Sequence, residues 1–518
     1  MPTTDTPWIK IVSLDPPSLQ DNTADADRLI AALKADLQTD HVDIDLDLLK
    51  QLPALLRKWE YRVGCILFKD RHRWLLTGIT DADNAGPVAG LAVDLGTTRV
   101  VLRLIDLSSG HILAESAFDN PQDTVGPDIL ARVHYAEQQS GLDRLNELII
   151  RGLNQAISEL CASIRIDPQH IHMLAVAGNT TMTHLFMGLS PHWIIREPYI
   201  PAVNTPPVIK ALSLGIRLNP NARALIFPNI GSYFGGDLIA GILYSEIDEN
   251  EETAILVDVG TNAEVVLGSS NWLIACAGAA GPALEGGVTR MGMTAGPGVI
   301  DKIVIDPDTR EFIIHTIDEK PPRGICGSGV IDLAAQLYLG GMIDLRGKFL
   351  PAQCGSRLNE IDGLPHLTVV PAGQSGTGSD LTISQADMDS LIRSKAAMYT
   401  ILETITASVG MALGDLKRFY VAGTFGSFID PRSAITIGML PDLALEAYKP
   451  LGNSSLGGAT LALTSSDCLA KMDRIRDRIT YLELNVNQEF MNRFSAAKFL
   501  PHTNHSLFPS VEVWRETI

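Results

Sequence analysis

Two short segments of the chain carry an aspartate in an apolar run and then continue with glycine and threonine. The first, LAVDLGTT at 91–98, contains Asp94, Gly96, Thr97 and Thr98. An ionised aspartate is costly inside an apolar strand unless it is paired, hydrated or beside a cation, so we expect Asp94 near the carboxyl end of a strand. Glycine lets the backbone turn closely, and the threonines offer N–H and hydroxyl donors. Together these residues predict a phosphate-binding hairpin beside a carboxylate suited to hydrated Mg²⁺.

The second segment, ILVDVGTN at 255–262, repeats the pattern with Asp258, Gly260, Thr261 and Asn262. A single hairpin of this kind could also be a turn capped by a buried aspartate, because aspartate and glycine are common turn residues. Two copies favour a nucleotide site, in which two facing loops clamp the β- and γ-phosphates from both sides of a cleft.

A third glycine-rich element, FYVAGTFGSFIDP at 419–431, comes after the two hairpins. It predicts an apolar strand running into Gly423 and Gly426, where the backbone could approach a flat ligand such as adenosine. A packed strand-to-helix turn is the alternative, because such turns are often rich in glycine. The chain has no G-x-x-x-x-G-K-[ST] motif, so a P-loop is excluded.

Two further glycine clusters lie at 277–298 and 323–332. Each could place backbone N–H groups at a helix N-terminus, where anions bind, and tight turns between packed elements are the alternative for both. The second cluster is better placed, since a helical run begins at Ile331. Glu285 in the first cluster could position a water molecule or cap a helix, and the residues do not separate these roles.

Composition limits the classes of protein. With 518 residues, 46% of them hydrophobic, the chain is long enough for two or three globular domains. The formal net charge of −19 would repel phosphate backbones and anionic lipid, and no run of Lys and Arg offsets it. No window of about 18 apolar residues occurs, and the N-terminus lacks the features of a signal peptide. We expect a soluble cytoplasmic protein that binds neither nucleic acid nor membrane.

The cysteines stand far apart and form no C-x-x-C or C-x4-C-x2-C pattern. This spacing argues against an iron–sulfur or zinc site made by neighbouring residues. A single buried thiol is the expected state of each. The six positions are Cys65, Cys161, Cys276, Cys326, Cys354 and Cys468.

Strands and turns must position the candidate residues, and the hydrophobic periodicity predicts where they lie. Residues 1–88 form a small α/β module, with helices over 25–38 and from about 45 to 53, and a strand pair at 61–70 and 71–80. A connector at 80–90 separates this module from the rest of the chain.

From residue 91 the pattern changes to strands joined by hairpins. Each aspartate strand opens a three-stranded meander, and longer helical stretches come next, for example at 142–161 and 331–339. The simplest arrangement is an α/β fold with one lobe over 91–250, a second over 251–518, and the small N-terminal domain before them.

The order of these motifs resembles the actin, sugar kinase and heat-shock chaperone ATPase superfamily. The amino-acid sequence around these motifs points to a narrower family, because it is similar to the reductive activators of corrinoid enzymes over nearly all of 91–465. PSLQDNTADADRL at 17–29 is similar to the linker and middle domain of that family. The similar segments are FDNPQDTVGPDILARVHYA at 118–136, AVAGNTTMTHLFMGL at 175–189, FPNIGSYFGGDLIAGIL at 227–243, CAGAAGPALEGG at 276–287, RGICGSGVIDLAAQL at 323–337 and VAGTFGSFIDPRSAITIGMLPD at 421–442.

The resemblance implies two ribonuclease H-like, actin-like lobes around an ATP cleft. It implies ATP hydrolysis that restores cobalt(I) in a corrinoid protein of a methyltransferase system, with ATP and Mg²⁺ as cofactors and a homodimer as the assembly. Well-known members carry a ferredoxin-type iron–sulfur domain, and this sequence contains none. We therefore expect no iron–sulfur cluster in the chain and a separate ferredoxin-like electron donor.

The resemblance also assigns residues. Asp94 and Asp258 would act in catalysis and hold Mg²⁺ through water. Phosphate and adenosine contacts fall to Gly96, Thr97, Thr98, Gly260, Thr261, Asn262, Gly423, Thr424 and Gly426, and Gly327, Ser328 and Gly329 join the cofactor-binding set. Cleft or hinge positions are Asn179, Thr180, Gly235, Gly236 and Asp237; for Gly236, a close helix contact is an equal alternative.

Two other functions stay open at this point. The absent cluster motivates a nucleotide-dependent module that binds or regulates a corrinoid protein without passing electrons. The shared superfamily allows a small-molecule kinase, although the similarity to activators runs through segments outside the common ATP site.

Overall fold

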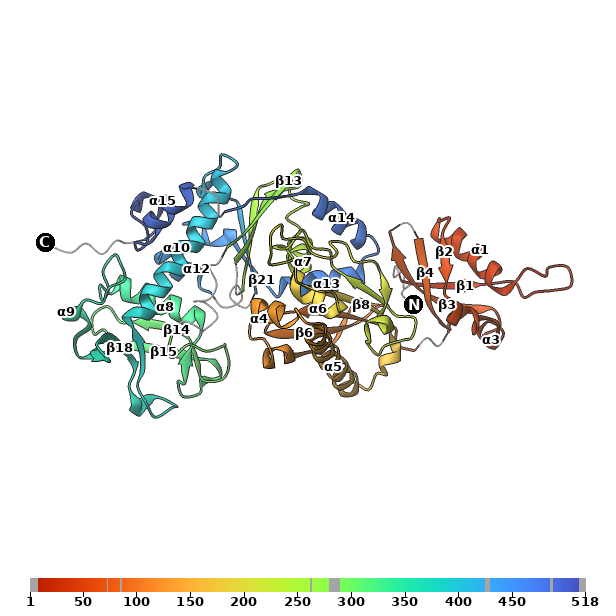
Figure 1. The fold of residues 1–518 in the computed structure, drawn as a ribbon, viewed down its shortest axis with the longest axis horizontal. Helices are drawn as coiled ribbons and strands as arrows, with labels where there is room; N and C mark the ends of the chain where they lie inside the picture. Colours follow the sequence, from red (N-terminus) through yellow and green to blue (C-terminus); the bar gives the residue numbers. More distant parts are fainter. Residues whose placement is uncertain are drawn as a thin grey trace. The chain divides into compact units, whose positions relative to one another are not determined.

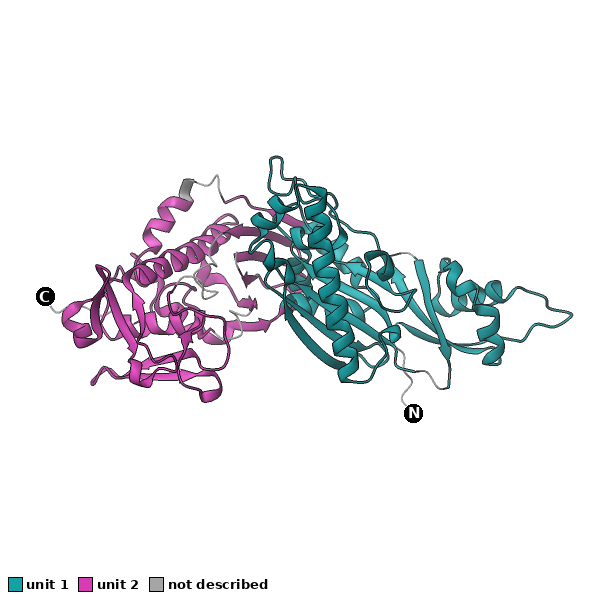
Figure 2. Cartoon of the chain, turned by 60° about the horizontal axis from the view of Figure 1, so that its bottom comes forward, with its two compact units in different colours: residues 1–244, 454–478 teal, residues 245–453, 479–518 magenta. Residues whose placement is uncertain are grey.

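The computed structural model describes residues 8–71, 73–83, 86–260, 263–278, 289–423, 429–484 and 488–511. Its contacts divide the chain into two compact units, which Figure 2 colours teal and magenta. Unit 1 comprises Met1–Tyr244 and Ser454–Arg478, and unit 2 comprises Ser245–Asn453 and Ile479–Ile518.

The first part of unit 1 is the small α/β module that the sequence predicts. Its sheet, shown in Figure 1, has the order β1-β3-β4-β2, with β3 and β4 antiparallel. Helix α1 buries Leu29 and Leu33 completely. The predicted helix after residue 45 is divided in two by a turn before Pro53. The elements are β1 (Ile9–Ser13), α1 (Asp25–Leu37), β2 (Val42–Ile44), α2 (Leu46–Leu49), α3 (Leu52–Lys58), β3 (Arg62–Asp70) and β4 (Arg73–Asp81).

The second part of unit 1 is a six-stranded sheet of order β7-β6-β5-β8-β10-β9. The predicted meander is confirmed as β5, β6 and β7, which are antiparallel, whereas β5, β8 and β10 run parallel. The strands are β5 (Ala89–Leu95), β6 (Arg99–Asp106), β7 (Ile112–Asp119), β8 (Ile171–Gly178), β9 (Ile209–Lys210) and β10 (Arg223–Ile226).

Successive side chains of β5 point to opposite faces of the sheet. Leu91 and Val93 belong to the buried core that includes Leu145 and Ile149 of α5 (Gln139–Ser163). On the other face, a Cβ added at Gly90 would lie 3.2 Å from the Leu463 side chain of α13 (Ser454–Thr464). Helices α5 and α13 therefore cover opposite faces of the strand that carries Asp94.

The sheet of unit 2 repeats five strands of this arrangement, the meander and two parallel strands, and differs in the edge on which its sixth strand lies. The strand order is β21-β20-β11-β12-β13-β22, in which β11, β12 and β13 form the second predicted meander and β20 and β21 continue in parallel from β11. The strands are β11 (Ala254–Val259), β12 (Ala263–Ser269), β13 (Trp272–Gly278), β20 (Arg418–Ala422), β21 (Tyr448–Gly452) and β22 (Ile479–Tyr481). The two-lobed α/β fold is thus confirmed by two sheets that share a meander and two parallel strands.

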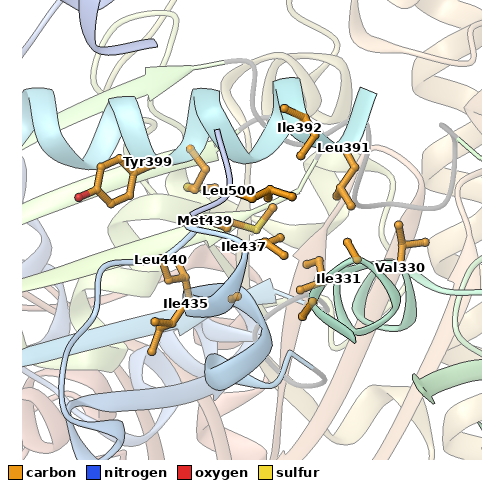
Figure 3. Packing of buried hydrophobic residues seen from close by; sticks show 14 of the residues in the cluster. Val330, Ile331, Leu391, Ile392, Tyr399, Ile435, Ile437, Met439, Leu440 and Leu500 are labelled. Atoms are coloured by element: carbon orange, nitrogen blue, oxygen red, sulfur yellow. The ribbon is translucent and has the colours of Figure 1, made fainter. Parts of the chain in front are cut away.

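The core of unit 2 lies where its longest helix, α10 (Gln385–Ala407), meets α8 (Gly327–Leu339) and the segment after α12 (Pro431–Thr436). Figure 3 shows Leu391, Ile392, Ile331 and Met439 converging there. Two three-stranded sheets flank this core. Their strands are β14 (Val299–Ile305), β15 (Phe312–Thr316), β16 (Gly324–Ile325), β17 (Leu358–Ile361), β18 (Leu364–Val370) and β19 (Leu381–Ser384).

Further α-helices lie within the described residues. They are α4 (Ile129–Tyr135), α6 (Thr180–Met187), α7 (Gly236–Ser245), α9 (Pro351–Cys354), α14 (Cys468–Arg478) and α15 (Gln488–Ala497). In the parts of the chain that the structure describes, no helix combines the length and hydropathy needed to cross a bilayer.

The predicted domain ranges 1–88, 91–250 and 251–518 stay a prediction. Unit 1 joins the first two ranges up to Tyr244, and residues 245–250 lie in unit 2. Ser454–Arg478 falls within the predicted second lobe but lies in unit 1. The physical reason is packing, because α13 lies against β5, β6 and β8 of the first sheet.

Candidate functional site

Asp94 lies one residue before the end of β5, as its cost in an apolar strand requires. It is half-buried, it pairs in register with Val101 on one side and Ala177 on the other, and Ser455 Oγ donates a 2.8 Å hydrogen bond to its Oδ1. The carboxylate therefore stands at the carboxyl edge of the sheet with one oxygen engaged by a hydroxyl.

The turn after β5 is tight at Gly96. A Cβ at this position would lie 2.2 Å from the Arg99 carbonyl oxygen, so only glycine permits the turn. Asn120 fixes the turn from its outer side: its Nδ2 donates to the Gly96 carbonyl at 2.9 Å, and its backbone N–H donates to the Thr98 carbonyl at 2.7 Å. Thr98 itself is exposed.

Asn179 brings a second element to the same turn. Its Oδ1 accepts from Met182 N and caps α6, while its Nδ2 donates to Thr97 Oγ1 at 3.0 Å. Thr180, the first residue of the helix, is buried and donates through Oγ1 to the Gly231 carbonyl at 3.3 Å. Asn179 and Thr97 therefore lie in one hydrogen-bonded group, and the cleft or hinge role of Asn179 stays a prediction.

The FGGD segment packs against Asn179. A Cβ at Gly235 would lie 2.3 Å from Asn179 Cα and 2.5 Å from Asp237 Oδ1. Gly236 instead faces Phe227, whose Cβ would be 2.5 Å from an added Cβ, so a close packing contact accounts for this glycine. Asp237 Oδ1 also accepts from Leu238 N at the start of α7.

The matching constellation of unit 2 surrounds Asp258. This carboxylate is half-buried one residue before the end of β11, and its register partners are Glu264 and Ala422. Gly423 comes directly after Ala422 with a φ of +80°, and a Cβ there would lie 3.0 Å from Asp258 Oδ1 and 2.9 Å from the Val259 carbonyl oxygen. Glycine at 423 is required by both backbone conformation and space.

Several predicted positions lie outside the described residues. These are Thr261, Asn262, Thr424 and Gly426, together with Glu285 of the first glycine cluster. Gly260 is described and half-buried directly after the Asp258 strand.

The second glycine cluster begins a helix, as predicted, but four residues before Ile331. Helix α8 starts at Gly327, and Gly327, Ser328 and Gly329 are all buried. A Cβ at Gly329 would lie 2.5 Å from the Ile300 carbonyl oxygen, so this glycine has a packing reason. Among the described contacts, none joins these three residues to Asp258.

The thiols are poor candidates for ligation. All six cysteines are free and buried. Burial raises the pKa of Cys65 and Cys468 to about 12 and that of Cys161 to about 11, so these three stay protonated at neutral pH.

Oxygen donors suit a hard cation better. Within the described ranges, no three His, Cys, Asp or Glu side chains gather as an all-protein metal cage. Asp94 and Asp258 instead lie at strand ends, which fits Mg²⁺, because this ion keeps several waters and usually takes one or two carboxylates together with substrate phosphates.

An open hollow of about 440 Å³ on unit 1 lies away from these residues. It is lined by Trp193, Ile200 and three other small or apolar residues besides Ser190. It contains no acid or base, so we do not assign the nucleotide to it.

Sequence reasoning missed Ser455 and Asn120. Asn120 lies in the segment 118–136, which is similar to the activator family, but no local pattern indicates its hydrogen bond to Gly96.

The sequence does contain a repeat that points to Gly178. Val-Ala-Gly occurs at 176–178 and again at 421–423, at the end of the strand that pairs in parallel with each aspartate strand.

Comparisons with known proteins agree with the two-lobed α/β fold. Three family models match in succession: the linker region of RACo at 7–85, its middle region at 89–250, and its C-terminal ASKHA (actin-like ATPase) domain at 252–512. The corrinoid activation enzyme RamQ of Eubacterium limosum is 29% identical over 482 residues, covering 89% of this chain and 80% of RamQ. The [Co(II) methylated amine-specific corrinoid protein] reductase of Methanosarcina barkeri is 25% identical over 438 residues, covering 78% and 75%.

A solved structure is similar over nearly the whole length of this chain. It is named a reductive activator for corrinoid, iron–sulfur protein, and it matches with a TM-score of 0.88 at 37% identity. The match covers 98% of this chain and 81% of that one.

Proposed function

The chain belongs to the RACo family of corrinoid reductive activators, and on this premise we propose that it hydrolyses ATP to drive reduction of a corrinoid protein. The reaction consumes ATP and water and yields ADP and phosphate, while one electron from a donor converts cobalt(II) in the partner to cobalt(I). The observation that supports this proposal is the pair of strand-end aspartates, each with a glycine two residues after it, in two sheets that share a meander and two parallel strands.

The residues of the chain have separate roles in this reaction. Asp94 and Asp258 would hold Mg²⁺ through water, and the ion would neutralise charge that develops on the phosphates. Gly96, held by Asn120, presents the backbone of the first turn, and Thr97, held by Asn179, orients its hydroxyl. Asn179 also caps α6, whose first N–H groups can donate hydrogen bonds to a phosphate oxygen.

Coupling to the partner needs a difference between two states. Nucleotide binding can change the affinity for a corrinoid protein only through contacts that differ between the nucleotide-bound and nucleotide-free forms. Those contacts would let hydrolysis assist an unfavourable reduction. We propose that the electron comes from a separate ferredoxin-like protein, since the cysteines of this sequence are scattered, free and buried.

The direct test is reconstitution. Purified protein, ATP, a low-potential ferredoxin and a corrinoid partner are combined anaerobically, and cobalt(I) is monitored by absorbance. Cobalt(I) should exceed that in an ATP-free control, and Asp94→Asn and Asp258→Asn should each reduce ATP hydrolysis by about a hundredfold or more, because each removes a carboxylate that anchors the metal. Equal cobalt(I) with and without ATP would rule out the activator function. Near-normal hydrolysis in either variant would show that the substituted aspartate does not hold the metal.

The second candidate is a nucleotide-dependent module that binds a corrinoid protein without passing electrons. The scattered, buried cysteines support this alternative, because they are poor ligands for a cluster that would pass electrons. Capture of the corrinoid partner that responds to ATP analogues, together with unchanged reduction kinetics, would support this alternative. The homodimer stays a prediction that light scattering on the purified chain tests.

A further inference from the structure

Helix α13 lies along the strand that carries Asp94. Gly90 and Asp94 share one face of β5, because residues four apart in a strand point the same way. A Cβ added at Gly90 would lie 3.2 Å from the Leu463 side chain of α13, and Ser455 Oγ lies 2.8 Å from Asp94 Oδ1. Eight helical residues rise ~12 Å and four strand residues ~13 Å, so the two contacts match an alignment of helix and strand.

The alignment places the N-terminus of α13 at the carboxyl end of β5. The first turn of a helix has backbone N–H groups without intrahelical partners, and its dipole favours a nearby negative charge. Ser455 is the second residue of α13 and is only 6% exposed. A hydroxyl and a helix terminus therefore both face the Asp94 carboxylate.

Two glycines hold α13 close to its neighbour α7. A Cβ at Gly457 would lie 2.7 Å from the Tyr244 ring, and a Cβ at Gly458 would lie 2.3 Å from the Ala240 carbonyl oxygen. Figure 1 shows α13 beside α7 and β8. This close approach leaves little freedom for the helix to slide away from Asp94.

The other end of α13 is also held. The Trp8 indole N–H donates to the Leu463 carbonyl at 2.6 Å, and Arg103 of β6 donates to Thr460 Oγ1 at 3.1 Å. Contacts at both ends and along one side fix where the Ser455 hydroxyl can be.

We infer that Ser455 is a positioning residue for Asp94. The terminal torsion of an aspartate is soft, so a free carboxylate samples many orientations. A hydrogen bond from a buried hydroxyl to Oδ1 restricts that rotation and is stronger because the acceptor is charged. The carboxylate is then held in one orientation before the metal arrives, which reduces the entropy lost on binding. This role rests on the proposed function of Asp94.

Ser454 provides a matched control. It precedes Ser455 in the same helix and is 1% exposed, and its Oγ has no hydrogen-bond partner among the described residues. Ser454→Ala and Ser455→Ala remove the same atom from adjacent buried sites, and only the second removes a hydroxyl that contacts Asp94.

The test measures ATP hydrolysis by the full chain at saturating ATP while the free Mg²⁺ concentration is varied. Ser455→Ala should raise the Mg²⁺ concentration for half-maximal rate by about tenfold, the usual effect of losing one hydrogen bond to a charged group. Ser454→Ala should leave it unchanged. Ser455→Cys keeps the volume with a weaker donor and should shift it in the same direction, so it decides the question if Ser455→Ala does not fold.

The outcomes separate this role from the site itself. Wild-type Mg²⁺ dependence in both Ser455 variants, with hydrolysis lost in Asp94→Asn, would overturn the role of Ser455 alone. Hydrolysis retained in Asp94→Asn would overturn the site assignment and this role together. An equal shift in Ser454→Ala and Ser455→Ala would show that helix packing, and not the bond to Asp94, sets the metal affinity.

Discussion

Replacing Gly423 with alanine should disable the second aspartate site without unfolding the protein. Gly423 has a φ of +80°, and an added Cβ would lie 3.0 Å from Asp258 Oδ1 and 2.9 Å from the Val259 carbonyl oxygen. Both distances are shorter than ordinary van der Waals contact. Either the carboxylate or the end of β11 must move by a few tenths of an ångström.

Gly410 provides the control for backbone strain. Its φ is +74°, and an added Cβ would meet nothing within 4 Å. Alanine in the left-handed region costs about 1 kcal/mol at either position. This shared cost cancels between the two variants, so any further loss in Gly423→Ala comes from the contacts with Asp258 and Val259.

The assay is ATP hydrolysis, with thermal unfolding measured in parallel. Both variants should lose about 1 to 2 kcal/mol of unfolding free energy. Gly423→Ala should also lose about tenfold to a hundredfold in hydrolysis rate, because a small displacement of a catalytic group is costly. Gly410→Ala should hydrolyse ATP at the wild-type rate. Equal rates in the two variants would refute the reasoning that Asp258 acts from the position seen here.

Two further predictions concern stability. Burial, with a smaller effect of the neighbouring His170, lowers the pKa of His172 from 6.5 to about 4. The unfolded chain therefore binds a proton that the folded chain excludes, and stability should fall as pH drops from 6.5 to 4, by about 3 kcal/mol at 1.36 kcal/mol per pH unit. His172→Gln should reduce that acid loss in urea unfolding, and an unchanged pH profile would contradict the assignment. Gly458→Ala should cost about 1 to 3 kcal/mol, because its Cβ would lie 2.3 Å from the rigid backbone of Ala240; wild-type stability and hydrolysis would show that α13 can move.

Much of the site could be predicted from residue types alone. An aspartate in an apolar run is tolerable only where its charge is compensated, so both aspartates were expected at strand ends, and Asp94 and Asp258 each lie one residue before the end. Gly96 was expected to make a tight turn, and the 2.2 Å clearance to the Arg99 carbonyl shows why no side chain fits. These predictions rest on local chemistry, which the sequence carries directly.

Other features depend on pairing across long distances. The parallel partners of the two aspartate strands, β8 and β20, are joined to them by long crossovers, and no local pattern sets their register. Asn120 donates hydrogen bonds to two backbone carbonyls of the first turn. Any asparagine could make these bonds, and only its position in the fold decides that Asn120 makes them. For Gly236, the sequence left a cleft role and a packing role equal, and the contact with Phe227 favours packing.

The sequence by itself determined the kinds of groups available, namely two strand-end carboxylates with glycine turns, repeated in two α/β lobes. Only the tertiary structure decided which groups meet them. Ser455 is 361 residues from Asp94, after five of the six strands of the second sheet, and it reaches the carboxylate because α13 returns to pack on β5. That return depends on Gly457 and Gly458 fitting against α7, a contact made by shape between distant segments, and such complementarity has no local signature in the chain.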